Sequence, residues 1–276
     1  MMKLAMILTV GLAACGSKAR NPDTIGAHGG STHAPVLVYF DWGMESVFEA
    51  ACWAPDAGGC DALRAKAAAG GELVAGGATF RMTGTRPEEC GASGDIAEVM
   101  GYTRIAGAED ASPGISTFPA NADIGLTRHE IREGDGAEPW MAELLAQRAT
   151  QDLVGTERAR KVGAGELAID HAVKANVTGG PADDYLISAS VALVGDEGPG
   201  YTWSGLVLVV DGDRRAPITL SHSDLEHYSI PATFDLDGDG VREFIWTADY
   251  YEGASMGGGR IVGGKLEQIS QVGCGA

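Results

Sequence analysis

Short runs of β-forming residues, divided by turn residues, dominate the second half of the chain. They predict strands over residues 167–177, 185–194, 201–210, 217–221 and 266–272, with further β structure at Phe234, 244–251 and 260–262. Glycine, proline and aspartate clusters separate these runs. We see no repeat of 20–50 residues, so an antiparallel sheet or sandwich is favoured over a propeller.

The first half mixes strands with helices. Strands are expected over residues 35–40, 72–74, 79–82 and 96–105, and a helix is expected over 61–69. A second helix opens at Glu138-Pro139 and carries a core-facing stripe at Trp140, Met141, Leu144 and Leu145. Glycine, at 41 of 276 residues, favours turns and strands over long helices. The expected class is α+β, mostly β, with one or two helices in the N-terminal half and an antiparallel sheet or sandwich in the C-terminal half.

The N-terminal segment has the pattern of an export signal. Lys3 is followed by 11 mainly apolar residues, too few to span a bilayer as a helix, and then by Cys15. Leu12-Ala13-Ala14-Cys15 resembles the lipobox of bacterial lipoproteins. The resemblance implies cleavage before Cys15, a diacylglyceryl thioether on its sulfur and palmitate-type acylation. Gly16, where an aspartate retains some lipoproteins in the inner membrane, favours the outer membrane of a bacterial cell envelope.

The expected organisation follows from these features. Residues 1–14 form the signal peptide, 15–34 a flexible polar tether, and 35–276 a β-rich globular body with a possible subdivision near 155–165. His28 and His33 are expected to be solvated within the tether. The net charge of −18 argues against nucleic acid as a partner and favours cations. The membrane is therefore the expected partner through the lipid anchor, and a protein or glycan ligand stays unidentified.

The remaining cysteines form an even set of four. They are Cys52, Cys60, Cys90 and Cys274. In an exported protein this number suggests two disulfides, for which three pairings exist. We favour Cys52–Cys60, which closes a tight loop, together with Cys90–Cys274.

An acidic loop supplies the clearest chemistry of the body. Asp235, Asp237, Asp239 and Glu243 occupy loop positions 1, 3, 5 and 9, and the backbone carbonyl of Val241 lies at position 7. Alternating aspartates with a glycine at position 6 suit calcium, which takes six to eight oxygen ligands. Position 12 is a tryptophan and both flanks have strand character, so the loop is not an EF-hand. Turn formation without a metal is the alternative interpretation.

The loop resembles the Asp-x-Asp-x-Asp-Gly loops of FG-GAP/VCBS-type repeats over residues 230–262. That resemblance implies a structural calcium ion in a loop that joins two strands. Only one copy of the loop is present, which does not support the propeller of that family.

No coherent catalytic set emerges from the remaining motifs. Gly253–Gly257 matches a nucleophile pattern around Ser255, but neither an aspartate nor a histidine follows it. His222 and His227 are five residues apart, which does not place them on one helix face, and a polar loop between strands is expected there. His129 and His171 are isolated in the sequence and are expected to be surface or satisfied residues.

These observations favour a cell-envelope lipoprotein with a structural calcium loop, acting as a binding or interaction module. Enzymatic activity stays open but is disfavoured. The alternative is an exported hydrolase on a calcium-stabilised β scaffold. A third hypothesis is a zinc-dependent enzyme centred on His222 and His227.

Overall fold

The structure is a computed structural model that describes the body of the chain in ten segments. They are residues 36–41, 47–54, 57–75, 78–90, 95–107, 114–117, 123–162, 166–193, 200–250 and 253–272. The signal segment, Cys15 and the tether lie outside these residues. All the described residues belong to one compact unit of the chain.

The first sheet is antiparallel and comes from residues 36–117. Its order is β3-β4-β5-β2-β1-β6. The strands are β1 (Val36–Asp41), β2 (Val47–Trp53), β3 (Glu72–Ala75), β4 (Ala78–Cys90), β5 (Asp95–Ala106) and β6 (Gly114–Thr117). Helix α1 (Ala57–Ala68) lies against β4 and buries Leu63 and Ala67, one turn apart. This helix begins four residues before the expected range.

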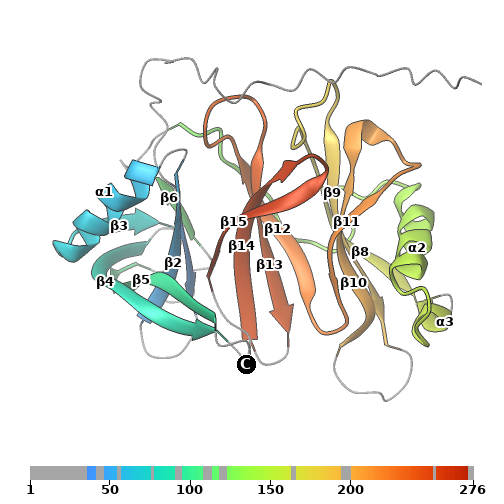
Figure 1. The fold of residues 1–276 in the computed structure, drawn as a ribbon, viewed down its shortest axis with the longest axis horizontal. Helices are drawn as coiled ribbons and strands as arrows, with labels where there is room; N and C mark the ends of the chain where they lie inside the picture. Colours follow the sequence, from blue (N-terminus) through green and yellow to red (C-terminus); the bar gives the residue numbers. More distant parts are fainter. Residues whose placement is uncertain are drawn as a thin grey trace, which may run out of the picture. The chain divides into compact units, whose positions relative to one another are not determined.

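Two further antiparallel sheets come from the rest of the chain (Figure 1). One has the order β11-β10-β9-β8, from β8 (Leu167–Ala175), β9 (Asp184–Ala192), β10 (Tyr201–Val209) and β11 (Ile218–Ser223). The other has the order β15-β14-β13-β12-β7, from β7 (Thr127–Arg128), β12 (His227–Phe234), β13 (Glu243–Tyr250), β14 (Gly253–Val262) and β15 (Lys265–Val272). The expected mostly-β class with C-terminal antiparallel sheets is confirmed.

These two sheets pack face to face as a sandwich. Apolar side chains of β8, β9 and β10, such as Leu186 and Leu206, form one buried cluster with Ile230, Phe244 and Trp246 from the other sheet. Alternation along each strand directs these residues inward. The sandwich core therefore lies between β8–β10 and β12–β14.

Helices cover the outer face of the β8–β11 sheet (Figure 1). Helix α2 (Met141–Asp152) buries Met141, Leu145 and Ala149 at intervals of four residues against β9 and β10, which confirms the expected apolar stripe. The short helix α3 (Ala159–Val162) adds Val162 to the same cluster. The described part of the expected boundary region, residues 155–162, thus follows α2 in the chain and includes α3.

The start of α2 differs from the expectation. Pro139 does not open the helix, because Trp140 is its N-cap. The Glu138 carboxylate accepts hydrogen bonds from the Trp140 indole and, at 2.6 Å, from the Tyr185 hydroxyl. Glu138 therefore fastens the entry of the helix to β9.

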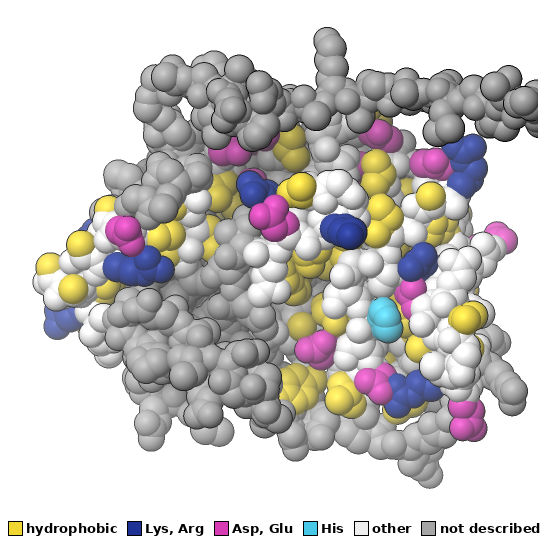
Figure 2. Space-filling model, in the orientation of Figure 1, with side chains coloured by type: hydrophobic (Ala, Val, Ile, Leu, Met, Phe, Trp, Pro, Cys, Tyr) yellow, Lys and Arg dark blue, Asp and Glu magenta, His cyan; other side chains and the backbone are white. Residues whose placement is uncertain are grey.

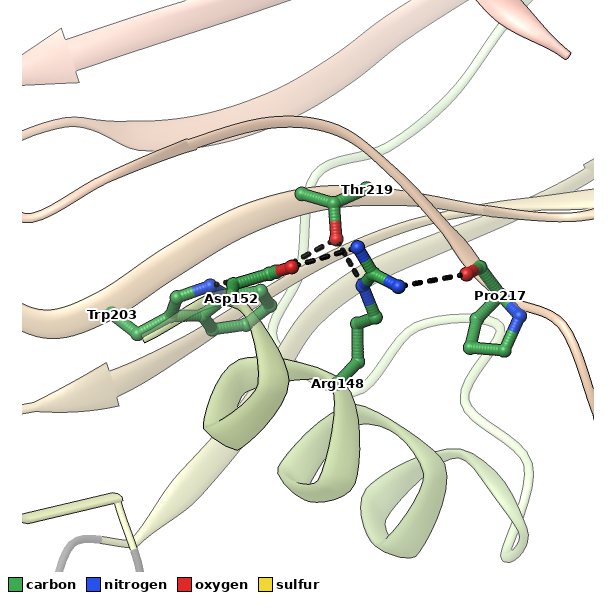
Figure 3. Close-up of polar contacts among 5 residues, drawn as sticks. All are labelled: Arg148, Asp152, Trp203, Pro217 and Thr219. Carbon is green, nitrogen blue, oxygen red and sulfur yellow. Dashed lines mark hydrogen bonds and ion pairs between the residues drawn. The ribbon is translucent and has the colours of Figure 1, made fainter. Parts of the chain in front are cut away.

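A polar network fastens the end of α2 to the sheet (Figure 3). Arg148 and Asp152, one turn apart, form an ion pair of 2.8 Å. Asp152 accepts hydrogen bonds from the Thr219 hydroxyl at 2.7 Å and the Trp203 indole at 3.3 Å, and Arg148 donates to the Pro217 carbonyl. The Asp152 side chain is 5% exposed, so this ion pair is screened little by water.

Trp53 joins β2 to the five-stranded sheet. Its side chain is 1% exposed and stacks on Phe234 with ring centroids 5.4 Å apart. A Cβ atom built on Gly258 would lie 1.5 Å from the Trp53 ring, and one on Gly257 would lie 2.1 Å from the Trp246 ring. These glycines leave the space that the two indoles occupy. Residues 253–262 form a continuous strand, so the Gly253–Gly257 pattern makes no nucleophile elbow.

A buried carboxylate organises the β8–β9 turn. Asp184 is fully buried and accepts the backbone N–H groups of Val177 and Thr178, both at 2.9 Å, and that of Asp211 at 2.8 Å. The Thr178 hydroxyl also lies 3.2 Å from this carboxylate. Four donors satisfy the buried charge.

One of the favoured cysteine pairs falls within the described residues. Cys52 and Cys60 lie at disulfide distance, with Cα atoms 5.8 Å apart, and link β2 to α1. Cys274 lies outside the described residues, as does the side chain of Cys90, so the pairing of those two stays a prediction.

Candidate metal centre

Three aspartates gather at the turn between β12 and β13. One carboxylate oxygen from each of Asp235, Asp237 and Asp239 lies within 4.8 Å of the others. Asp237 and Asp239 are exposed and Asp235 is half-buried, so the cluster opens to solvent. The spacing predicted from the sequence therefore brings the three carboxylates together on one side of the loop.

Hydrogen bonds within the loop hold these carboxylates in place. Asp235 accepts the N–H groups of Gly238 at 2.7 Å and Gly240 at 3.0 Å. Asp239 accepts the N–H of Val241 at 2.8 Å. Gly238 and Gly240 both have positive φ, 76° and 83°, which allows the chain to wrap around the Asp235 side chain.

Buried residues on either side of Asp235 anchor the loop. Phe234 is fully buried and Leu236 is 4% exposed, and both belong to the cluster that contains Trp53. Glu243, the residue at loop position 9, is 5% exposed and accepts the Leu236 N–H at 2.8 Å. The alternation therefore places apolar residues beneath the loop and aspartates above it.

Neighbouring segments support the loop from both sheets. The backbone carbonyl of Asn176, in the β8–β9 turn, accepts the Arg242 N–H at 2.8 Å. The Arg242 guanidinium donates to the Thr233 carbonyl at 3.1 Å, the Thr127 hydroxyl at 2.9 Å and the Gly125 carbonyl. Arg242 is thus engaged by β7 and β12.

The electrostatics of the loop favour a cation. Partial desolvation of the Asp237 carboxylate raises its pKa, and the charge of Asp239 raises it further. Burial also raises the pKa of Glu243 to about 7, with added contributions from the charges of Asp237 and Asp235. Carboxylates crowded in this way repel one another, and a divalent cation relieves that repulsion.

The acidic and imidazole groups of residues 222–227 separate into two environments. His222 is exposed on β11. It lines a cavity of about 700 Å³ together with Arg158, Thr202 and Asp224. Arg158 and Asp224 form an ion pair there. Figure 2 shows acidic and basic side chains next to one another at several places on one face, and apolar side chains in the areas that separate these places.

His227 instead contacts strand β8. Its Nε2 lies 3.2 Å from Asp170 Oδ1, which also accepts the Ser190 hydroxyl at 3.1 Å. This hydrogen bond raises the pKa of His227 above its ordinary value of 6.5, although burial lowers it. The charge of Asp249 also raises the pKa. The Tyr201 ring lies 5.8 Å away by centroids. The expected polar loop between strands is present at residues 224–226, but sequence reasoning missed the Asp170–His227 pair.

His129 and His171 were expected to be surface or satisfied residues, and each ring has a hydrogen-bond partner, the Thr233 hydroxyl for His129 and the Ile230 carbonyl for His171. The sequence did not show that the two rings lie close together. Their ring centroids lie 6.1 Å apart, although the residues are far apart in the sequence. Strand pairing causes the approach: His129 follows β7, which pairs with β12, and β12 packs against β8, which carries His171. No local sequence pattern reports such a contact.

Comparisons of the chain with protein families, with curated proteins and with solved structures gave no match. Among the described residues, no helix has the length and apolar character needed to cross a bilayer. The functional conclusion therefore depends on the residues and the geometry described above.

Proposed function

We propose that this chain is an exported, lipid-anchored β protein of the bacterial cell envelope, whose Asp235–Glu243 loop binds one structural calcium ion. In this proposal the body acts as a binding or interaction module. The observation that carries the calcium proposal is the approach of the Asp235, Asp237 and Asp239 carboxylates to within 4.8 Å. The lipobox at Cys15 supports the anchor.

A structural role for calcium is supported by what surrounds the loop. Its residues alternate between solvent and a core cluster that contains Phe234 and Leu236. Glu243 and the carbonyl of Val241 are the further oxygen donors expected at loop positions 9 and 7. A bound ion would restrain the backbone between β12 and β13.

Thermal unfolding with and without calcium tests the site. For a dissociation constant of about 0.1–1 mM, about 10 mM calcium should add roughly 1.4–2.7 kcal/mol of stability. Asp237→Asn should abolish this increase. Asp183→Asn, a change in another exposed turn, should leave it intact. An identical melting curve for the wild type in calcium and in chelator would refute the calcium proposal.

Fractionation tests the anchor separately. The wild type should incorporate labelled palmitate and sediment with membranes, and Cys15→Ala should release the protein into the soluble exported fraction. Absence of label from the wild type would remove the lipid anchor and leave the calcium proposal standing.

A hydrolytic activity is the second candidate, and the Asp170–His227 pair is the observation that favours it. A carboxylate that holds an imidazole 3.2 Å away is a common arrangement for a general base. Chromogenic esters, glycosides and phosphoesters would test this activity. Turnover by the wild type that His227→Gln abolishes would support it, and no turnover of any of these substrates would exclude hydrolysis of those classes.

A further inference from the structure

A cavity of about 700 Å³ lies between the segment that follows α2 and the turn that follows β11. Small-molecule sites have volumes of about 300–1,000 Å³, so this cavity is large enough for one ligand. Leu153, at the end of α2, lines it and belongs to the core cluster between the helices and the sheet. The cavity is therefore attached to a packed part of the body.

Polar side chains of both signs line the rest of this cavity. Glu157 and Asp224 supply carboxylates, Arg158 supplies a guanidinium, and His222 supplies an imidazole. A ligand with only negative charge would be repelled by the two carboxylates, and a ligand with only positive charge would be repelled by Arg158. A ligand that carries both charges can pair with both kinds of side chain.

The Arg158–Asp224 ion pair is the part of the lining that can change partners. Its two side chains are 41% and 44% exposed, and among the described residues each charged group has only the other as a partner. Exposed ion pairs contribute little to stability, so a ligand can open this one at small cost. The guanidinium has five N–H donors, which leaves several for a second carboxylate.

The backbone that carries these groups is held in place. The Ser223 hydroxyl accepts two backbone N–H groups of the turn after β11, at 3.1 and 3.2 Å, and the Asp224 carbonyl accepts the Tyr201 N–H at 2.8 Å. A Cβ atom at Gly200, whose φ is 128°, would lie 2.6 Å from that carbonyl oxygen. On the other side of the cavity, the Thr156 hydroxyl donates to a carbonyl at the end of α2 at 2.7 Å. A restrained backbone reduces the entropy that is lost when a ligand binds.

We propose that this cavity binds a free α-amino acid and prefers one with a basic side chain. Arg158 binds the ligand carboxylate and Asp224 binds the ligand ammonium group. One carbon atom joins these two groups in an α-amino acid, so the ligand charges are adjacent, as those of Arg158 and Asp224 are. The ends of an extended peptide are farther apart and cannot match an adjacent pair in this way.

Glu157 determines the preference for a basic side chain. It lines the same cavity and gives the lining one more carboxylate than guanidinium, which favours a positive charge on the remainder of the ligand. The proposal rests on the binding-module part of the proposed function and gives that module a class of ligand. It requires neither the calcium ion nor the lipid anchor.

Calorimetric titration of the full-length chain with L-arginine, L-glutamine and L-glutamate tests the proposal. We expect one equivalent of arginine to bind, more tightly than glutamine, and glutamate to bind most weakly. Agmatine, which is arginine without its carboxylate, and Nα-acetylarginine, which lacks the α-ammonium charge, should each bind at least about tenfold more weakly than arginine.

Variants of the lining assign the two charges of the ligand. Arg158→Gln and Asp224→Asn should each weaken arginine binding by at least about tenfold, and both should melt as the wild type does because the side chains are half-exposed. Glu157→Gln should reduce the preference for arginine over glutamine. Arg132→Gln breaks another exposed ion pair, with Glu130, and should leave the affinity unchanged.

Several results would overturn the proposal. They are no saturable binding of any of the three amino acids at millimolar concentration, agmatine binding as tightly as arginine, tightest binding of glutamate, and unchanged affinity in both Arg158→Gln and Asp224→Asn. An equal loss in Arg132→Gln would also overturn it, because the effect would then be one of general charge. Melting the same samples with and without calcium tests the acidic loop separately, so a calcium response without amino-acid binding would reject only the proposal made for this cavity.

Discussion

Adding one methyl group to Gly258 should disrupt the packing between β2 and the five-stranded sheet. The Cβ atom of Gly258→Ala would lie 1.5 Å from Cη2 and 1.6 Å from Cζ2 of the Trp53 indole. Real Cβ atoms do not approach a ring so closely, so the indole must move or the strand must shift. The neighbours of Trp53 in the core leave little room for either, because the side chain is 1% exposed and stacked on Phe234.

The expected destabilisation lies between two limits. If the indole shifts within the core, overpacking costs about 1–3 kcal/mol. If it is expelled, the loss approaches the roughly 3–5 kcal/mol of a Trp→Ala change. We expect about 3 kcal/mol for Gly258→Ala, which lowers the urea midpoint by about 1–1.5 M for a slope of about 2–3 kcal/mol/M.

Urea unfolding followed by far-ultraviolet circular dichroism measures this change, and a double-mutant cycle with Trp53→Leu locates its cause. Without the indole, adding the methyl group should cost less than about 1 kcal/mol, so the coupling energy should exceed about 2 kcal/mol. Ser255→Ala, which removes one hydroxyl group from a half-buried side chain on the same strand, should stay within about 0.5 kcal/mol of the wild type. An equal loss from Gly258→Ala in the presence and absence of the indole would refute this steric argument.

Three further predictions concern buried polar groups and the disulfide. Asp184→Ala should lower the free energy of unfolding by about 3 kcal/mol in urea, because it leaves buried donors without their acceptor. The protonated His227 contributes stability that is fully present below its ordinary pKa of 6.5 and is lost as the pH rises through its higher folded pKa. His227→Gln should therefore remove this decline from a plot of melting temperature against pH. A decline of the same size in the variant would exclude His227 as its source. Replacing Cys52 and Cys60 by alanine should cost about 2.5 kcal/mol, given their separation of 8 residues, and thiol titration of the unfolded wild type should find both cysteines blocked.

Local sequence patterns predicted the elements whose structure is decided locally. Strands β8, β9, β10, β11, β13 and β15 fall close to their expected ranges because alternation and turn residues act over a few positions. Strands β12 and β14 each begin seven residues before the expected β structure, at His227 and Gly253, because pairing with β13 fixes their length. The same holds for the acidic loop, since alternating aspartates within five residues must share one side of a turn. Helix α2 was found from its apolar stripe, but its first residue was misplaced, because the Glu138 side chain bonds to Tyr185 on a distant strand.

Contacts set by strand pairing could not be predicted in this way. Nothing near His171 in the sequence shows that His129 lies beside it, and the Asp170–His227 pair likewise joins two sheets. The packing role of the glycines of β14 could not be predicted from the sequence either, although the missing aspartate and histidine already argued against an elbow. These glycines resemble a nucleophile elbow in sequence, whereas the structure uses Gly257 and Gly258 to accommodate two indole rings.

The Trp53 indole connects the candidate metal loop to the rest of the body. Asp235 lies between Phe234 and Leu236, and both of these pack in one cluster with Trp53 of β2. An ion held by the aspartates would fix the backbone whose inward side chains support that tryptophan. Calcium removal should therefore change the environment of a side chain in the first sheet, and not only the loop itself. A calcium-dependent change in indole fluorescence that Trp53→Phe abolishes would support this coupling, and a calcium-dependent signal unchanged in that variant would show that the loop acts alone.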